Sequence, residues 1–109
     1  MGNRKKTEEV GIRGLQSISD LEIDIMRIVW EKDKTTVREV HETILKREIE
    51  SRKNGFTPYT TIMSTMSSLA KRGFLKQDAG AKTYTYKAAM DEKELTKTII
   101  KTVAEKLLV

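Results

Sequence analysis

Apolar residues recur every three or four positions in two stretches between residues 19 and 50, which is the period of one face of an α-helix. They are Leu21, Ile25, Ile28 and Val29 in the first stretch and Val37, Val40, Ile44 and Leu45 in the second. Each stretch opens with a hydroxyl residue three positions before a glutamate, in Ser19-Asp20-Leu21-Glu22 and in Thr36-Val37-Arg38-Glu39, and this spacing is typical of a capped helix start. The pattern predicts two amphipathic helices, one ending near Lys32 and one giving way to a charged loop from Lys46 to Gly55.

A third helix is predicted by the residues that would begin and end it. Thr57 has a hydroxyl suited to an N-cap, and Pro58 follows at the first helical position, where its missing N–H is not needed. Gly73 stands where helices commonly end in a left-handed residue, and Lys71 and Arg72 lie in the last turn, against the negative end of the helix dipole. We therefore expect a helix that runs from Pro58 to Arg72.

After Gly73 the pattern changes to that of two short strands, Phe74 to Gln77 and Thr83 to Lys87, with Tyr84 and Tyr86 on one face. The segment from Asp78 to Ala81 supplies a turn, so the two strands are expected to form a β-hairpin. Asp91 and Glu94 repeat the cap-like spacing and begin a final helix. The apolar face of that helix is wider than a small domain needs and comprises Leu95, Ile99, Ile100, Val103, Ala104, Leu107 and Leu108.

The order helix, helix, helix, hairpin, helix is that of a winged helix-turn-helix unit followed by one more helix. The expected fold class is mainly α with a small β-hairpin wing. A flexible basic arm is expected over residues 1–17 and a winged-helix DNA-binding domain over residues 18–90. Residues 91–109 are expected to form a C-terminal helix that serves, wholly or in part, for dimerisation.

Composition narrows the class of function. The chain has 109 residues, enough for one domain, and 21 Lys and Arg against 16 Asp and Glu give a net charge of +5, which favours an anionic partner. The lack of cysteine excludes disulfides and thiolate chemistry and fits a reducing cytoplasm. No apolar run approaches the roughly 20 residues of a membrane span. His41, the one histidine, has no neighbour at metal spacing, and no nucleophile–base arrangement is visible, so we expect no metal, cofactor or enzymatic activity.

The predicted third helix is rich in hydroxyl groups, which belong to Thr57, Tyr59, Thr60, Thr61, Ser64, Thr65, Ser67 and Ser68. At about 100° per residue, one side of this helix is apolar and must face the core through Ile62, Met66, Leu69 and Ala70. The other side is short and uncharged until it becomes basic at Lys71 and Arg72. Short hydroxyl side chains let a helix backbone enter the major groove, and they can donate to or accept from base edges and phosphates. A solvated face without a partner is the alternative.

These features predict a DNA-binding surface made of two kinds of residue. Along the third helix, base edges and phosphates would meet Thr57, Tyr59, Thr60, Thr61, Ser64, Thr65, Ser67 and Ser68. Phosphates would also meet Arg38, Lys71 and Arg72 on the helices, and Lys82 and Thr83 at the tip of the wing. Each of the five phosphate candidates also has an alternative role without DNA. Arg38 could form an ion pair with Glu42, and Lys71 and Arg72 could complement the helix dipole. Lys82 and Thr83 could simply belong to a solvated turn.

Four motifs in this order resemble the penicillinase-repressor family, which includes bacterial β-lactamase, methicillin-resistance and copper-responsive repressors. The first motif comprises Leu21-Glu22, Ile25-Met26 and Val29-Trp30, and the second is Thr36-Val37-Arg38-Glu39-Val40. The third joins Tyr59-Thr60-Thr61-Ile62 to Leu69 and Arg72-Gly73-Phe74-Leu75, and the fourth is Tyr84-Thr85-Tyr86. Together they cover roughly Ile18 to Met90.

The resemblance implies a homodimeric winged-helix repressor that binds an inverted-repeat operator in double-stranded DNA, with its third helix in the major groove and its wing on the backbone. It also implies that the segment after the wing builds the dimer, here through Leu95, Ile99, Ile100, Val103 and Leu107. In the family, an upstream membrane sensor and proteolysis often carry the signal, so a sensor protease is an expected partner by resemblance alone.

The sequence departs from the family pattern in four places. Ser68 stands where relatives commonly carry Arg, and the segment from Lys46 to Gly55 is longer than usual. No cysteine is present for the copper chemistry of the copper-responsive members. The chain ends at Val109 in an apolar run where relatives continue, which leaves open a fragment or a shortened homologue.

Two other classes of function remain open from the sequence. A winged helix can serve protein–protein assembly, with the hydroxyl face against a partner chain and no DNA bound. An RNA-binding module is the other possibility, although Tyr84 and Tyr86 are few for the aromatic platform that single-strand recognition uses.

Overall fold

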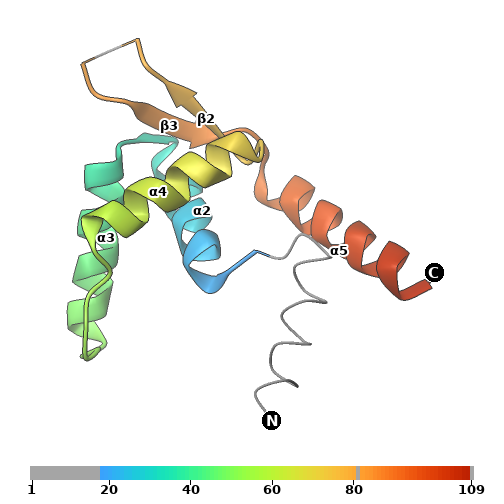
Figure 1. Cartoon of the computed structure of the whole chain (residues 1–109), viewed down its shortest axis with the longest axis horizontal. Coiled ribbons are helices and arrows are strands. Elements are labelled where there is room, and N and C mark those ends of the chain that lie inside the picture. Colours follow the sequence, from blue (N-terminus) through green and yellow to red (C-terminus); the bar gives the residue numbers. More distant parts are fainter. Residues whose placement is uncertain (1–17, 81, 109) are drawn as a thin grey trace.

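The computed structural model describes residues 18–80 and 82–108, so the predicted arm over residues 1–17 lies outside the described part of the chain. In chain order the elements are α2 (Asp20–Lys32), β1 (Lys34–Thr35), α3 (Val37–Glu50), α4 (Tyr59–Lys71), β2 (Leu75–Asp78), β3 (Thr85–Ala88) and α5 (Glu92–Leu108). Figure 1 shows α2, α3 and α4 gathered into one unit, with the hairpin of β2 and β3 projecting from it and α5 extending away on another side. The predicted fold class, mainly helical with a β wing, is confirmed.

Reciprocal caps begin α2 and α3, as the two motifs predicted. In α2 the backbone N–H of Ser19 donates to Glu22 Oε1 at 2.8 Å, and the N–H of Glu22 donates to Ser19 Oγ at 3.2 Å. In α3 the same pair of bonds joins Thr36 and Glu39 at 3.0 and 3.1 Å. Because each box satisfies backbone donors that a helix start leaves unpaired, these local signals suffice to place both N-termini.

The end of α3 differs from the prediction, because the helix continues to Glu50 instead of giving way to a loop at Lys46. Glu48 faces inward on the same side of the helix as Val40 and Ile44 and is only 7% exposed. Its carboxylate has hydrogen-bonding partners across the following loop, so a charged residue is buried there without loss of its polar contacts.

Of the predictions for the two ends of α4, one is wrong and one is confirmed. The predicted N-cap Thr57 is wrong, because Pro58 takes that position and the Thr57 hydroxyl donates to Glu48 instead. The predicted ending at Gly73 is confirmed, with φ at 86°. The N–H of Phe74 donates to the carbonyl of Leu69 at 2.9 Å, and the N–H of Gly73 donates to the carbonyl of Ala70 at 3.1 Å, which is the bond pattern of a Schellman motif.

The wing belongs to a three-stranded antiparallel sheet in the order β1-β3-β2. Strand β1 was not predicted from the sequence, because a segment of two residues between helices is too short to show the alternation of a strand. In the register, Thr35 lies opposite Tyr86, and Lys34 and Lys76 both lie opposite Lys87. The prediction that Tyr84 shares a strand face with Tyr86 is wrong, because β3 begins at Thr85 and Tyr84 is 55% exposed while Tyr86 is 2% exposed.

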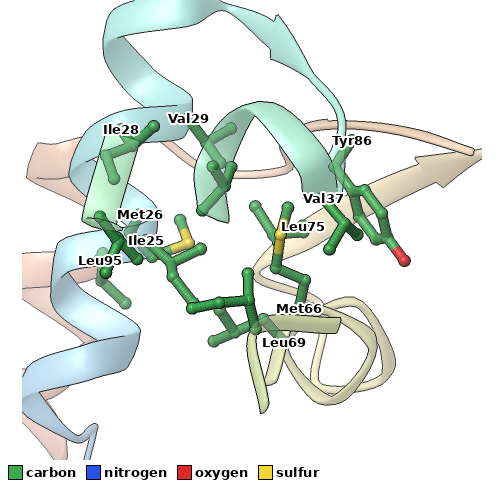
Figure 2. Packing of buried hydrophobic residues seen from close by; sticks show 13 residues of the cluster. Ile25, Met26, Ile28, Val29, Val37, Met66, Leu69, Leu75, Tyr86 and Leu95 are labelled. Carbon is green, nitrogen blue, oxygen red and sulfur yellow. The ribbon is translucent and has the colours of Figure 1, made fainter. Parts of the chain in front are cut away.

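One hydrophobic core joins the helices to the sheet. Figure 2 shows buried side chains that come from α2, α3, α4, β2, β3 and α5, among them Ile25, Val37, Met66, Leu75, Tyr86 and Leu95. Trp30 packs against this core and donates its indole N–H to the carbonyl of Met90 at 3.0 Å, which ties the end of α2 to the segment that leads into α5. Burying each large aliphatic side chain contributes about 1.5–3 kcal/mol. Because Ile62, Met66 and Leu69 of α4 belong to this cluster, the core fixes which face of α4 is left outside.

Candidate nucleic-acid interface

The outer face of α4 is the surface that the sequence predicted for DNA, and the structure leaves it accessible. Ile62, Met66 and Leu69 have no exposed surface and hold the other face in the core. On the outer face Tyr59, Thr60, Ser64 and Lys71 are exposed, while Thr61, Thr65, Ser67 and Ser68 are half-buried. No Asp or Glu occurs in α4, so nothing on this helix repels a phosphate.

Two of these hydroxyl groups bond to the helix itself. Ser64 Oγ donates to the carbonyl of Thr61 at 3.2 Å, and Thr65 Oγ1 donates to the same carbonyl at 2.7 Å. Each hydroxyl oxygen keeps acceptor capacity, and its proton can rotate toward a new acceptor. The face therefore has polar groups that can adapt to either donors or acceptors on base edges.

The loop before α4 is held by a buried carboxylate that the sequence analysis missed. Glu48 Oε1 accepts the backbone N–H of Thr57 at 3.0 Å, and Glu48 Oε2 accepts the Thr57 hydroxyl at 2.6 Å. The Thr57 hydroxyl bond is the main cause that lowers the pKa of Glu48. The spacing in the sequence could have indicated this buried position, because Glu48 follows Ile44 by four residues on the buried face of α3.

Other contacts of this loop fix its path against α3. His41 Nε2 lies 3.1 Å from the carbonyl oxygen of Thr57, and the His41 ring meets the ring of Tyr59 edge-on at 5.6 Å. Thr57, predicted to contact DNA, therefore serves to position the start of α4 in this structure.

At the other end of α4, Arg72 is bound within the fold. Its Nη1 lies 2.6 Å from Glu22 Oε2, and the two side chains are only 27% and 14% exposed. The guanidinium also lies over the ring of Phe74, 4.8 Å from its centroid. Arg72 was expected to contact phosphate, but the structure places it in a contact that joins α4 to α2. Lys71, the neighbouring cation, is exposed.

The remaining predicted phosphate contacts lie on exposed surface. Arg38 faces Glu42 at 3.9 Å with most of its side chain in solvent, so that pair holds it only weakly. Lys82 and Thr83 are exposed between β2 and β3, at the wing tip. There the Gly80 N–H donates to Asp78 Oδ1 at 2.8 Å, which stabilises the turn.

A row of three lysines crosses the outer face of the sheet, and no sequence pattern indicated it. Lys87 in the central strand lies opposite both Lys34 and Lys76, and all three are exposed. Lys34 is 4.0 Å from Asp78, an exposed and therefore weak pair. Like charges directly opposite across strands repel each other, so this lysine row favours an anionic partner.

The residues predicted to form the dimerisation face of α5 fall into two groups, one packed on the core and one accessible. Leu95 is 5% exposed and belongs to the core, and Ile99 packs against that core, so their assignment to a free dimer face is corrected. Ile100 and Leu107 are 61% and 75% exposed, and Val103 is half-buried. The apolar surface that remains available on α5 is therefore its distal half.

The described residues offer little support for other kinds of site. A hollow of about 480 Å³ lies between the start of α2 and the end of α3, but its lining mixes Asp20 and Asp24 with Arg47 and Lys53. In residues 18–80 and 82–108, no three His, Cys, Asp or Glu residues are grouped so as to hold a metal ion. Within the same part of the chain, no helix has the length and apolar character needed to cross a membrane.

Three helices, a β wing and an accessible third helix define a winged helix-turn-helix protein. A solved structure with this fold is described as the solution structure of the DNA binding domain of the repressor BlaI. It matches with a TM-score of 0.57 and 23% sequence identity, covering 71% of this chain and 85% of that chain. The family model described as penicillinase repressor matches residues 18–109, and the chain belongs to that family. No curated relative matches the chain.

Proposed function

We propose that this protein is a transcriptional repressor that binds double-stranded DNA through α4, and that it is a regulator and not an enzyme. The observation that carries the proposal is the outer face of α4, which is accessible, rich in hydroxyls and free of acidic side chains. Membership of a repressor family supports the same function. A face of this kind suits the major groove, because it is slim and neutral and both donates and accepts hydrogen bonds.

The contacts divide by chemistry. Thr60, Thr61, Ser64, Thr65, Ser67 and Ser68 meet base edges or nearby phosphates, and Tyr59 lies at the positive end of the helix, where a phosphate is favoured. Arg38, Lys71, Lys82 and Thr83 contact the backbone, and the lysine row extends that positive surface. Thr57 and Arg72 act indirectly by holding the two ends of α4. Phosphate contacts supply affinity by releasing counterions, and base contacts supply sequence preference.

The same proposal includes a homodimer on an inverted-repeat operator. Ile100, Val103 and Leu107 supply apolar surface on the part of α5 beyond the core, and two copies joined there would present two α4 helices to two half-sites. Occupancy of the operator would then exclude polymerase from a promoter in the cytoplasm. Release by an upstream sensor protease is part of the proposal by family resemblance alone.

A mobility-shift titration with random-sequence duplex at low salt tests DNA binding, and selection of bound sites from a random duplex pool identifies the operator. Retarded complexes that weaken steeply with added salt are the expected result. A winged helix used only for protein assembly would retard no duplex even in dilute buffer, and that result would overturn the proposal.

A further inference from the structure

Met63 places a long apolar side chain at the edge of the hydroxyl face of α4. It is 45% exposed, whereas Ile62, directly before it, and Met66, three residues after it, have no exposed surface. At about 100° per residue it lies roughly 40° around the helix from Ser67 and roughly 60° from Thr60. Its thioether is therefore next to the hydroxyl groups that are proposed to meet base edges.

A single exposed methionine is ordinary on a protein surface, but Met63 is not single. Tyr59, one helical turn earlier, is 44% exposed, and Phe56, just ahead of α4, is 56% exposed. Tyr59 packs edge-on against His41 of α3 at 5.6 Å, and Met63 lies about 40° from Tyr59 around the helix, so both lie toward the side of α4 that faces α3. Tyr59 and Met63 thus border the hydroxyl face along the N-terminal half of α4, and Phe56 adds an exposed apolar side chain just ahead of the helix.

We infer that Met63 recognises the 5-methyl group of a thymine in each operator half-site. The inference rests on the proposed function, since it requires α4 to lie in the major groove. There, the thymine methyl is the apolar group on base edges, whereas the other groups are hydrogen-bond donors or acceptors. A methionine is unbranched, flexible and polarizable, so it can adjust to a methyl group beside it. The neighbouring Thr60 and Ser67 hydroxyls then serve the polar atoms of adjacent bases.

Deoxyuridine substitution tests this directly, because deoxyuridine differs from thymidine only by the missing 5-methyl group. Duplexes carrying a selected site, with each thymidine in turn replaced by deoxyuridine, are titrated by fluorescence anisotropy against the full chain and against Met63→Ala. For the full chain, one position per half-site should lose about fourfold in affinity, the factor expected for one buried methyl group. For Met63→Ala the thymidine and deoxyuridine duplexes should bind equally at that position.

Ile49→Ala is the matched control, because Ile49 is an apolar residue of similar exposure, 57%, that belongs to α3 and not to α4. It should keep both the affinity and the fourfold methyl effect. Ala is the best helix former, so Met63→Ala should fold, and a thermal melt by circular dichroism checks this. Tight binding with no deoxyuridine effect, or an unchanged effect in Met63→Ala, overturns the inference while leaving DNA binding intact. Failure to bind any duplex overturns the proposed function and this inference with it.

Discussion

Single residues in this protein have roles set by their partners more than by their type. Glu48 and Glu39 are both acidic residues of α3, and hydrogen bonds lower the pKa of both. Glu39 caps its own helix through Thr36, a local contact that the sequence predicted. Glu48 holds Thr57 nine residues away and thereby the start of α4. Two hydroxyl groups differ in the same way, since the Thr57 hydroxyl, ahead of α4, bonds to Glu48 of another helix, whereas the Ser64 hydroxyl bonds only within α4 and lies on its exposed face.

The Glu48 contact makes stability depend on pH in the acid range. The Thr57 hydroxyl and N–H bonds lower the folded-state pKa of Glu48 from its usual value of 4.5, so the unfolded chain binds a proton first as the pH falls. The stabilisation is therefore complete above that value and is lost as the pH drops through the lowered folded pKa. Urea unfolding of the wild type from pH 7 to pH 3 should show this loss.

Between pH 7 and pH 3 the unfolding free energy of Glu48→Gln should fall less than that of the wild type, because the amide does not ionise. At pH 7, Glu48→Ala should cost about 1–3 kcal/mol of unfolding free energy, since the half-buried Thr57 donors lose their acceptor. An acid dependence in Glu48→Gln equal to that of the wild type would show that this carboxylate is not its source.

Ser64→Ala and Lys82→Ala should separate sequence preference from general affinity. Ser64→Ala removes a hydroxyl from the exposed face and should reduce the preference for operator over random duplex by about 1 kcal/mol. Lys82→Ala should weaken all duplexes alike and reduce the slope of log affinity against log salt by about 0.9. Anisotropy titrations at several salt concentrations measure both, and an unchanged slope in Lys82→Ala would remove the wing tip from the interface.

At the scale of elements, α4 is held at both ends by side chains from other helices. Glu48 of α3 fixes its start through Thr57, and Glu22 of α2 fixes its end through Arg72. The sequence predicted both limits of α2, the start of α3 and the end of α4, because these depend on residues a few positions apart. The end of α3, the N-cap of α4 and the strand β1 were not predicted, because these three features depend on contacts across the fold.

The lysine row should show opposite effects on stability and on binding. Lys87→Gln removes the central charge of the row, so it should raise the unfolding free energy by about 0.2–1 kcal/mol through relief of cross-strand repulsion. It should also weaken binding to every duplex. Lys97→Gln, at an exposed site on α5, is the control and should change neither quantity appreciably. Denaturant melts and anisotropy titrations give both values, and greater stability with unchanged affinity would exclude this sheet face from the interface.

At the scale of the whole molecule, α5 has a core part and an exposed part. Leu95 closes the core of the winged helix, whereas the helix beyond it extends away from the three-helix unit in Figure 1. A symmetric pair of such helices would bury their apolar residues and set the distance between two α4 helices, which is how a dimer matches an inverted repeat.

Leu107→Glu should therefore lower both the oligomeric mass and the affinity for an inverted-repeat site. Leu107 is 75% exposed, so the substitution should leave the fold of the single chain intact. Thr96→Glu, another exposed α5 position that is polar already, is the matched control. Sedimentation velocity at micromolar concentration measures the mass, and a monomeric wild type under these conditions would count against the dimer.

The sequence by itself determined the helical period, the reciprocal caps of α2, of α3 and (through Asp91 and Glu94) of α5, the glycine ending of α4 and its hydroxyl face, because each depends on neighbours within one or two helical turns. Only the tertiary structure decided that Glu48 and Arg72 hold α4, that three lysines align across the sheet, and that Leu95 belongs to the core. Those outcomes depend on which segments distant in the chain come to lie together. Local periodicity does not tell which distant strand pairs with β3, or which partner a charged side chain from another element meets.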